Sequence, residues 1–145
     1  MKVAHIGQGK DTLSELPKIP AHMSVEGKKA YKNMGELLCQ ANRLKTYMLP
    51  VLEIFAEAYA QWHWACKEIN RLNKEKYGRG YIQRFAGGAR NISPEITCRD
   101  KAADAMMRCS KQFGLDPRSE KELKTAVDAG QGDLFAEFNK ALNGN

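Results

Sequence analysis

The 145-residue sequence has no long apolar run. Basic or polar residues interrupt every apolar stretch well before the roughly 20 residues that a membrane-spanning helix needs. The first ten residues, Met1–Lys10, also lack the apolar segment of a secretory signal. We therefore expect no membrane partner and a cytoplasmic protein, in the host cytoplasm if the protein is viral.

Cysteine is sparse and scattered. The four cysteines, Cys39, Cys66, Cys98 and Cys109, form no CxxC pair and match neither a zinc ribbon nor a disulfide framework. We interpret them as buried free thiols. His63 and Cys66 lie one helical turn apart, but no second pair at ligand spacing follows, so we expect no metal site.

The common catalytic motifs are also missing. There is no GxxxxGKS or GxxxxGKT phosphate loop, no GxSxG or HExxH motif, and no GxGxxG after a predicted strand. The three histidines have dissimilar surroundings, and the carboxylates occur in charged, surface-type helices, so no general base stands out. The sequence therefore predicts a protein that is not an enzyme and needs no cofactor.

The patterns that are present are mainly helical, and the length suits one domain. Residues 1–18 show no periodicity and contain glycine and proline, which predicts a flexible N-terminal arm. Ser24 is a suitable N-cap for a helix over about residues 24–41, where apolar residues recur every three or four positions. One face of this helix must be buried.

A second, longer helix is predicted from Thr46, a plausible N-cap, to about Lys76, with Pro50 in its first turn. Seven apolar residues along it alternate at spacings of four and three, the heptad pattern of a helix-packing seam. They are Met48, Leu52, Phe55, Tyr59, Trp62, Cys66 and Ile69. The seam can pack within the chain, as a helical hairpin, or between subunits, as an oligomer interface, and the sequence leaves both open.

Glycines interrupt the helical pattern over residues 77–91, and Tyr81–Phe85 has the composition of a strand, which predicts a short β-hairpin or ordered loop. Ser93 and Pro94 are typical of a helix start, and Gly114 of a helix end, so a third helix is expected between them.

The last part of the chain is charged and then amphipathic. Apolar residues at helical spacing over residues 133–142 predict a short helix suited to docking on a partner. The predicted organisation is thus a flexible arm over residues 1–18, a helical core with an oligomerisation seam and a basic loop over 19–118, and a partner-docking segment over 119–145. The fold class is mainly α.

Positive charge is concentrated in one segment, Lys67–Arg90. Seven basic residues there face only two acidic ones, so the segment carries +5 of the chain's net +6. The basic residues are Lys67, Arg71, Lys74, Lys76, Arg79, Arg84 and Arg90. Lysine and arginine bind phosphates, and nearby glycines let backbone N–H groups approach them, so these seven residues are the candidate DNA-binding set. The alternative is a solvated face with favourable cations at a helix C-terminus.

A helix-turn-helix is less favoured. The first two predicted helices are joined by a link of suitable length. A recognition helix, however, reads bases mainly with its N-terminal residues, and here these are Tyr47–Pro50, which suit packing better than base edges.

Several stretches together resemble the small subunit of phage terminase. They are Ile19-Pro20-Ala21-His22-Met23-Ser24, Ala30-Tyr31, Leu52-Glu53-Ile54-Phe55-Ala56-Glu57-Ala58-Tyr59-Ala60-Gln61-Trp62, Ser93-Pro94, and Phe113-Gly114-Leu115-Asp116-Pro117-Arg118-Ser119 with Leu123. The resemblance spans roughly Ile19 to Leu123, and the stretch from Phe113 to Leu123 is its most specific part. The sequence departs from the family's pattern at Thr46–Pro50, where an acidic helix start is usual.

This resemblance implies a non-catalytic subunit that forms a homo-oligomeric ring and binds double-stranded viral DNA. It also implies that a terminal segment regulates the terminase large subunit, the ATPase and nuclease of genome packaging. Two other hypotheses share the basic segment or the helical core: a small dimeric DNA-binding transcriptional regulator, and a structural adaptor whose basic loop is only a solvated face.

Overall fold

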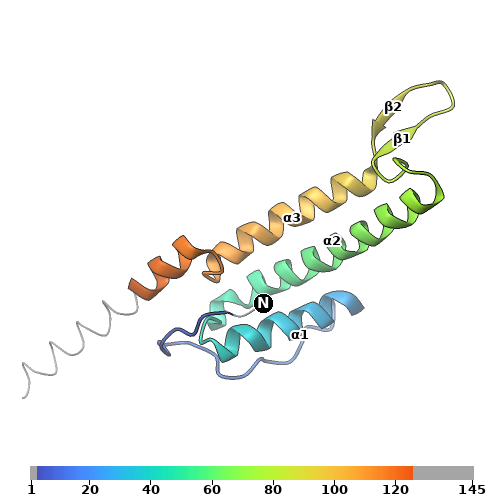
Figure 1. Ribbon diagram of the computed structural model, residues 1–145. Coiled ribbons are helices and arrows are strands. Elements are labelled where there is room, and N and C mark those ends of the chain that lie inside the picture. The colour runs from blue at the N-terminus through green and yellow to red at the C-terminus, as the bar shows by residue number, and fades with distance from the viewer. Residues whose placement is uncertain (1–2, 126–145) are drawn as a thin grey trace, which may run out of the picture.

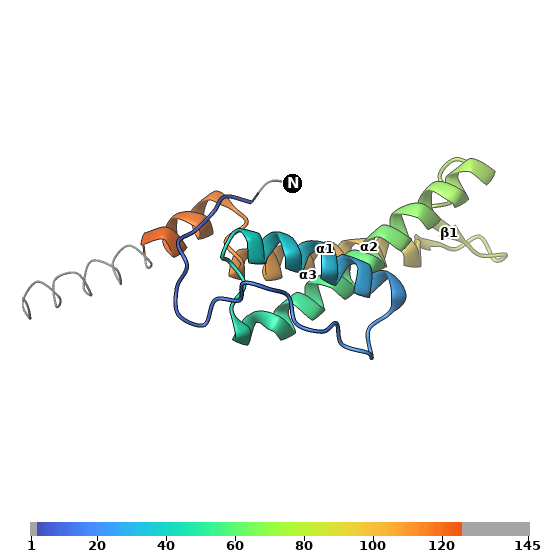
Figure 2. The same ribbon diagram turned by 90° about the horizontal axis from the view of Figure 1, so that it is seen from below.

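The computed structural model describes residues 3–125. Its elements are α1 (Val25–Gln40), the short 3-10 helix η1 (Thr46–Met48), α2 (Leu49–Glu75), β1 (Ile82–Arg84), β2 (Arg90–Ile92) and α3 (Pro94–Gln112). α2 and α3 run antiparallel side by side, and α1 packs on the first part of α2 (Figures 1 and 2). The predicted mainly helical fold, with a long central helix and a small hairpin, is confirmed. Within these residues, no helix combines the length and apolarity needed to cross a membrane.

α1 begins where its sequence predicts. The Ser24 hydroxyl accepts a hydrogen bond from Gly27 N at 2.9 Å, and Glu26 lies near the positive end of the helix. Ser24 N in turn donates to Glu57 Oε1 on α2 at 2.8 Å. The N-terminal end of α1 therefore lies beside Glu57, so α1 covers α2 only from its start to about that residue (Figure 1).

The start of α2 differs from the prediction. Thr46 does not cap the long helix but begins η1, a tighter turn that ends at Met48. Met48 then occupies the N-cap position of α2 without a side-chain capping bond, and Pro50 lies in the first turn as expected. Backbone contacts tie this turn to the N-terminal segment: Thr46 N donates to Asp11 O at 3.2 Å, and Lys45, just before the turn, pairs with Thr12.

The core lies where α1, the start of α2 and the end of α3 meet. Tyr31, Leu38, Leu52 and Phe113 are almost completely buried there. Phe113 meets Phe55 edge to face, with ring centroids 6.5 Å apart. Burial of apolar surface at this end, worth about 25 cal/mol per Å², is the main stabilising term.

The four cysteines are free, as expected, but only two are buried. Cys39 and Cys109 belong to the core, whereas Cys66 and Cys98 are partly exposed. Burial raises the pKa of both the Cys39 and the Cys109 thiols, because the apolar surroundings disfavour the thiolate.

Residues 3–18, expected to form a flexible arm, lie along the core in this structure. Ile6 is buried and its N–H donates to Ala41 O at 2.9 Å, while Leu13 N donates to Leu44 O at 2.8 Å. The Leu16 side chain covers α1 where Gly35 leaves room for it. Sequence patterns gave no indication of these contacts, because each joins the segment to residues about 20 to 35 positions away.

α3 begins and ends at the predicted residues. The Ser93 hydroxyl accepts from Ile96 N at 3.2 Å, Pro94 occupies the first helical position, and Gly114 follows the helix with a φ of 67°. Residues 117–125 are again helical, and Asp116 caps them by accepting from Ser119 N at 3.0 Å. The amphipathic helix predicted over residues 133–142 lies outside the described residues.

Candidate nucleic-acid interface

The fold brings the predicted basic residues to one end of the helical pair. Lys67, Arg71 and Lys74 lie on the last turns of α2 and are exposed. Lys76 and Arg79 follow in the turn, and Arg84 and Arg90 lie on the hairpin that extends beyond the ends of α2 and α3 (Figure 1). The core lies at the other end of α3, where the buried Arg43 contacts Phe113 O.

Ion pairs within the chain occupy two of these seven cations. Arg71 Nη1 lies 2.9 Å from Glu75, and Arg71 also pairs with Glu68. Arg79 Nη1 lies 2.5 Å from the second oxygen of Glu75. The hydrogen bond from Arg71 lowers the pKa of the Glu68 carboxyl, which keeps the pair charged. Arg71 and Arg79 must therefore exchange an existing partner before they can contact a phosphate.

Arg84 and Arg90 differ from these two. β1 and β2 pair antiparallel, and the register places Arg84 directly opposite Arg90. Cross-strand partners have Cβ atoms about 4.5 to 5.5 Å apart, and like charges in such pairs are destabilising. Within residues 3–125, neither guanidinium has a carboxylate at ion-pair distance, and both residues are exposed. The hairpin therefore presents two adjacent positive charges that the described chain does not neutralise.

The base of the hairpin is held firmly. Asn73 Oδ1, on the last turn of α2, accepts from Gly78 N at 3.2 Å and from Gly80 N at 2.9 Å. Ser93, which is buried, donates from its hydroxyl to Gly80 O at 2.6 Å and from its N–H to Tyr81 O at 2.9 Å. Gly80 lies so close to the backbone of Ile69 that a Cβ there would clash with the Ile69 carbonyl oxygen.

Sequence reasoning missed the part played by Asn73. Its signal is only an amide near a helix end, followed by two glycines, and that pattern is common. The sequence predicts Ser93 as the cap of the third helix, but the bond from its hydroxyl to Gly80 O joins residues 13 apart and has no local signature.

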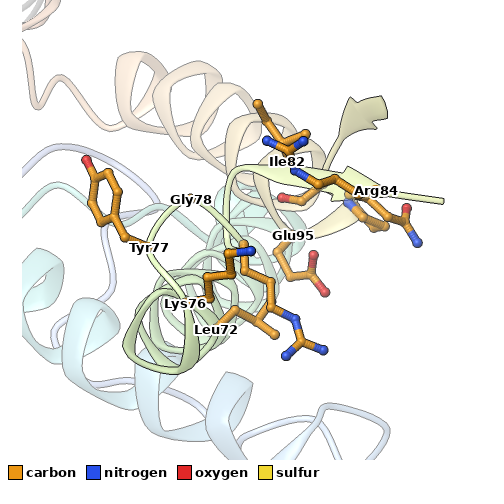
Figure 3. A pocket seen from close by; sticks show the side chains of 11 residues that line it. Leu72, Lys76, Tyr77, Gly78, Ile82, Arg84 and Glu95 are labelled. Carbon is orange, nitrogen blue, oxygen red and sulfur yellow. The ribbon is translucent and has the colours of Figure 1, made fainter. Parts of the chain in front are cut away.

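A cavity of about 490 Å³ lies at the base of the hairpin, between the end of α2 and the start of α3 (Figure 3). Lys76, Arg79 and Arg84 line it together with Glu95. The ring of Tyr77 points away from Lys76 and Glu95 (Figure 3). The cavity thus carries a positive balance, reduced by one carboxylate from the first turn of α3. In the described part of the chain, no cluster of three or more histidine, cysteine or acidic residues is arranged to hold a metal ion.

The heptad seam is divided between two environments. Met48, Leu52, Phe55 and Ile69 are buried within the chain itself, as packing in a helical hairpin would bury them. The other three seam residues, Tyr59, Trp62 and Cys66, remain partly accessible, and Tyr59 is 40% exposed. They lie beyond Glu57, where α1 no longer covers α2. Tyr59 stacks on His63 and lies against Trp62, with centroids 6.1 and 6.3 Å away.

These features define a small helical protein with a basic β-hairpin at one end and a partly uncovered aromatic face on its longest helix. Residues 27–129 match the family model described as phage terminase, small subunit. The match covers most of the chain, so the chain belongs to this family, and its role lies in the packaging of phage DNA. No curated protein and no solved structure gives a significant match.

Proposed function

We propose that this chain is the non-catalytic, DNA-binding subunit of a phage terminase. In this proposal it contacts double-stranded viral DNA through the Lys67–Arg90 segment, assembles into a homo-oligomeric ring and regulates the large subunit. The family supports DNA and the large subunit as partners. The observation that supports the DNA contact is the Arg84 and Arg90 pair. Their charges face each other across the hairpin, and neither guanidinium forms an ion pair with a carboxylate of residues 3–125.

Two double variants with the same change in charge test this contact. Arg84→Gln/Arg90→Gln removes the two unneutralised guanidiniums, whereas the control Arg71→Gln/Arg79→Gln removes two that are already paired with Glu68 and Glu75. Binding of a fluorescent phage DNA duplex is measured by anisotropy at several salt concentrations. Each phosphate contact contributes about −0.9 to the slope of log K against log salt.

We expect the hairpin variant to reduce the slope by about 1.8, since two contacts are lost, and the control to reduce it by less than about 0.9. Equal losses in both variants would mean that diffuse positive charge, rather than the hairpin, attracts the DNA. An unchanged slope in the hairpin variant would remove the hairpin from the DNA site.

The ring is proposed to use the uncovered part of the seam, Tyr59, Trp62 and Cys66. The heptad spacing continues along α2 beyond Glu57, where the N-terminal end of α1 lies. A second copy of the chain can therefore cover the part of α2 that α1 leaves exposed. A Tyr59→Glu variant is expected to lower the mass of the assembly in light scattering. Tyr47→Glu, at a side chain that is 67% exposed in η1, is the control and should leave the mass unchanged. A wild-type protein that is strictly monomeric at micromolar concentration contradicts the ring.

A further inference from the structure

The hairpin between α2 and α3 is a narrow ribbon that stands clear of the helical body (Figures 1 and 2). All eleven of its residues, 82–92, are exposed. Beyond the two strands, Phe85 N donates to Ala89 O at 2.9 Å, so the paired region extends to residues 85 and 89. At about 3.3 Å per residue, the five paired positions from Tyr81 to Phe85 give a ribbon about 16 Å long.

Each face of this ribbon has its own chemistry. Side chains alternate along a strand, so cross-strand partners and their second neighbours share a face. One face therefore carries Arg84 and Arg90 near the tip, and below them the paired residues Ile82 and Ile92. The opposite face carries the amides of Gln83 and Asn91, which are also cross-strand partners, and nearer the tip Phe85 opposite Ala89.

The turn adds a second feature: two of its three loop residues, Gly87 and Gly88, have no side chain. Gly88 N donates to Phe85 O at 3.0 Å and Gly88 has a φ of 88°, the left-handed position of a three-residue hairpin loop, so the turn itself requires this glycine. Gly87 is different. Its φ is not in the left-handed region, and a Cβ built there meets nothing within 4 Å. No contact in the described chain explains the missing side chain at Gly87.

The charge around the hairpin identifies the kind of partner. From Lys76 to Pro94 the chain has four basic residues and no acidic one. Protein interfaces are depleted in charge at their centres, whereas nucleic-acid interfaces are strongly basic. Arg84 and Arg90 are held side by side near the tip, and neither forms an ion pair with a carboxylate of the described residues. Such a pair suits a polyanion better than an apolar protein surface.

We propose that this hairpin enters the major groove of double-stranded DNA, tip first, and that the bare Gly87 lets the turn approach the base edges. The inference rests on the proposed DNA-binding function and adds the binding mode. The major groove, about 12 Å wide and 8.5 Å deep, admits a two-stranded ribbon, whereas the minor groove, about 6 Å wide, does not. A ribbon of about 16 Å reaches the floor of the major groove while its base stays outside.

In this mode the ribbon offers both kinds of contact. Arg84 and Arg90 bind phosphates along the groove, the Gln83 amide can pair with adenine, and Ile82 can contact a thymine methyl group. The firm anchoring of the base by Asn73 and Ser93 holds the ribbon in place before binding, which lowers the entropy lost when the complex forms.

A DNA duplex with a blocked groove tests the mode. Anisotropy compares the full-length protein on an ordinary duplex and on the same sequence with glucosylated 5-hydroxymethylcytosine, whose sugar fills the major groove. We expect at least a tenfold weaker binding to the blocked duplex, and no effect of netropsin, a minor-groove ligand.

Gly87→Asp, which the turn accepts, should weaken binding to the ordinary duplex tenfold or more, and Gly87→Asn should weaken it less because it adds bulk without charge.

Ala21→Asp adds the same charge in the exposed loop before α1 and should change affinity less than threefold. Equal affinity of the wild-type protein for the two duplexes would overturn the groove mode and leave DNA binding itself standing. Failure to bind either duplex would overturn the proposed function and this inference together. If Gly87→Asp changes the mass of the assembly and leaves DNA affinity intact, the hairpin is an interface between copies and the inference is wrong.

Discussion

Replacing Arg43 with methionine should destabilise the protein strongly, because this one side chain joins three segments of the chain. Arg43 Nε donates to Ala4 O at 2.8 Å, and Nη1 donates to the carbonyl oxygens of Phe113 (3.3 Å) and Gly114. Nη2 lies 3.2 Å from Glu120 Oε1 but lacks hydrogen-bond geometry, so this last contact is one of charge alone. The side chain is only 1% exposed.

The magnitude follows from these contacts. Hydrogen bonds from a charged donor are worth about 1.5 to 3 kcal/mol each, and they are not additive within one network. Removing one member of a buried pair costs about 3 to 5 kcal/mol, but Glu120 is 31% exposed and can be hydrated, which reduces the cost. We therefore expect a loss of about 3 kcal/mol in the free energy of unfolding, out of a total of about 5 to 15 kcal/mol.

Urea unfolding followed by circular dichroism measures this loss. The wild-type protein, Arg43→Met and its control must be compared at one protein concentration, since assembly changes the apparent stability. The control is Arg118→Met, the same substitution at a side chain that is 90% exposed and pairs with Glu122 on the surface, and its effect should stay within about 0.5 kcal/mol. A loss below about 1 kcal/mol for Arg43→Met would refute the reasoning, because it would fall within the range of an ordinary single hydrogen bond.

Three further predictions concern local features. Gly114→Ala should cost at least about 1 kcal/mol in unfolding experiments, because the φ of 67° disfavours a side chain and the new Cβ would clash with Leu123; an unchanged midpoint would contradict this. Ser93→Ala removes both the cap of α3 and the bond to the hairpin base, so it should cost about 1 to 2 kcal/mol and speed hydrogen exchange at the hairpin base; unchanged exchange would show that the bond does not hold the hairpin. Burial raises the pKa of Cys39 and Cys109 and shields both thiols in the core, so at pH 8 they should react with a thiol reagent more slowly than the partly exposed Cys66 and Cys98; four equal rates would contradict the burial.

Local chemistry made much of the fold predictable. Ser24, Ser93, Pro94 and Gly114 act within one turn of where they stand, and the helices begin and end beside them. The contacts of Arg43 and of residues 3–18 were not predictable, because they join segments that are distant in the sequence and depend on the packing of the finished fold.

The candidate site shows a similar limit. Counting charges over Lys67–Arg90 located the basic end of the molecule but treated its seven cations as equal. The helical spacing of Glu68, Arg71 and Glu75 distinguishes Arg71 from the cations without such a partner, since residues three and four apart on a helix pair with each other. The opposition of Arg84 and Arg90, by contrast, depends on the strand register, which the turn at Gly88 sets.

The distance between the hairpin and the core makes the two sets of variants independent. α3 has 19 residues, so at 1.5 Å per residue its ends lie about 28 Å apart. Charges at the hairpin are therefore well beyond the screening length of about 8 Å at physiological salt from the Arg43 network, and sites this far apart have additive effects on stability. It follows that a loss of DNA affinity in the hairpin variants, at unchanged unfolding free energy, reports on the contact with DNA and not on the fold.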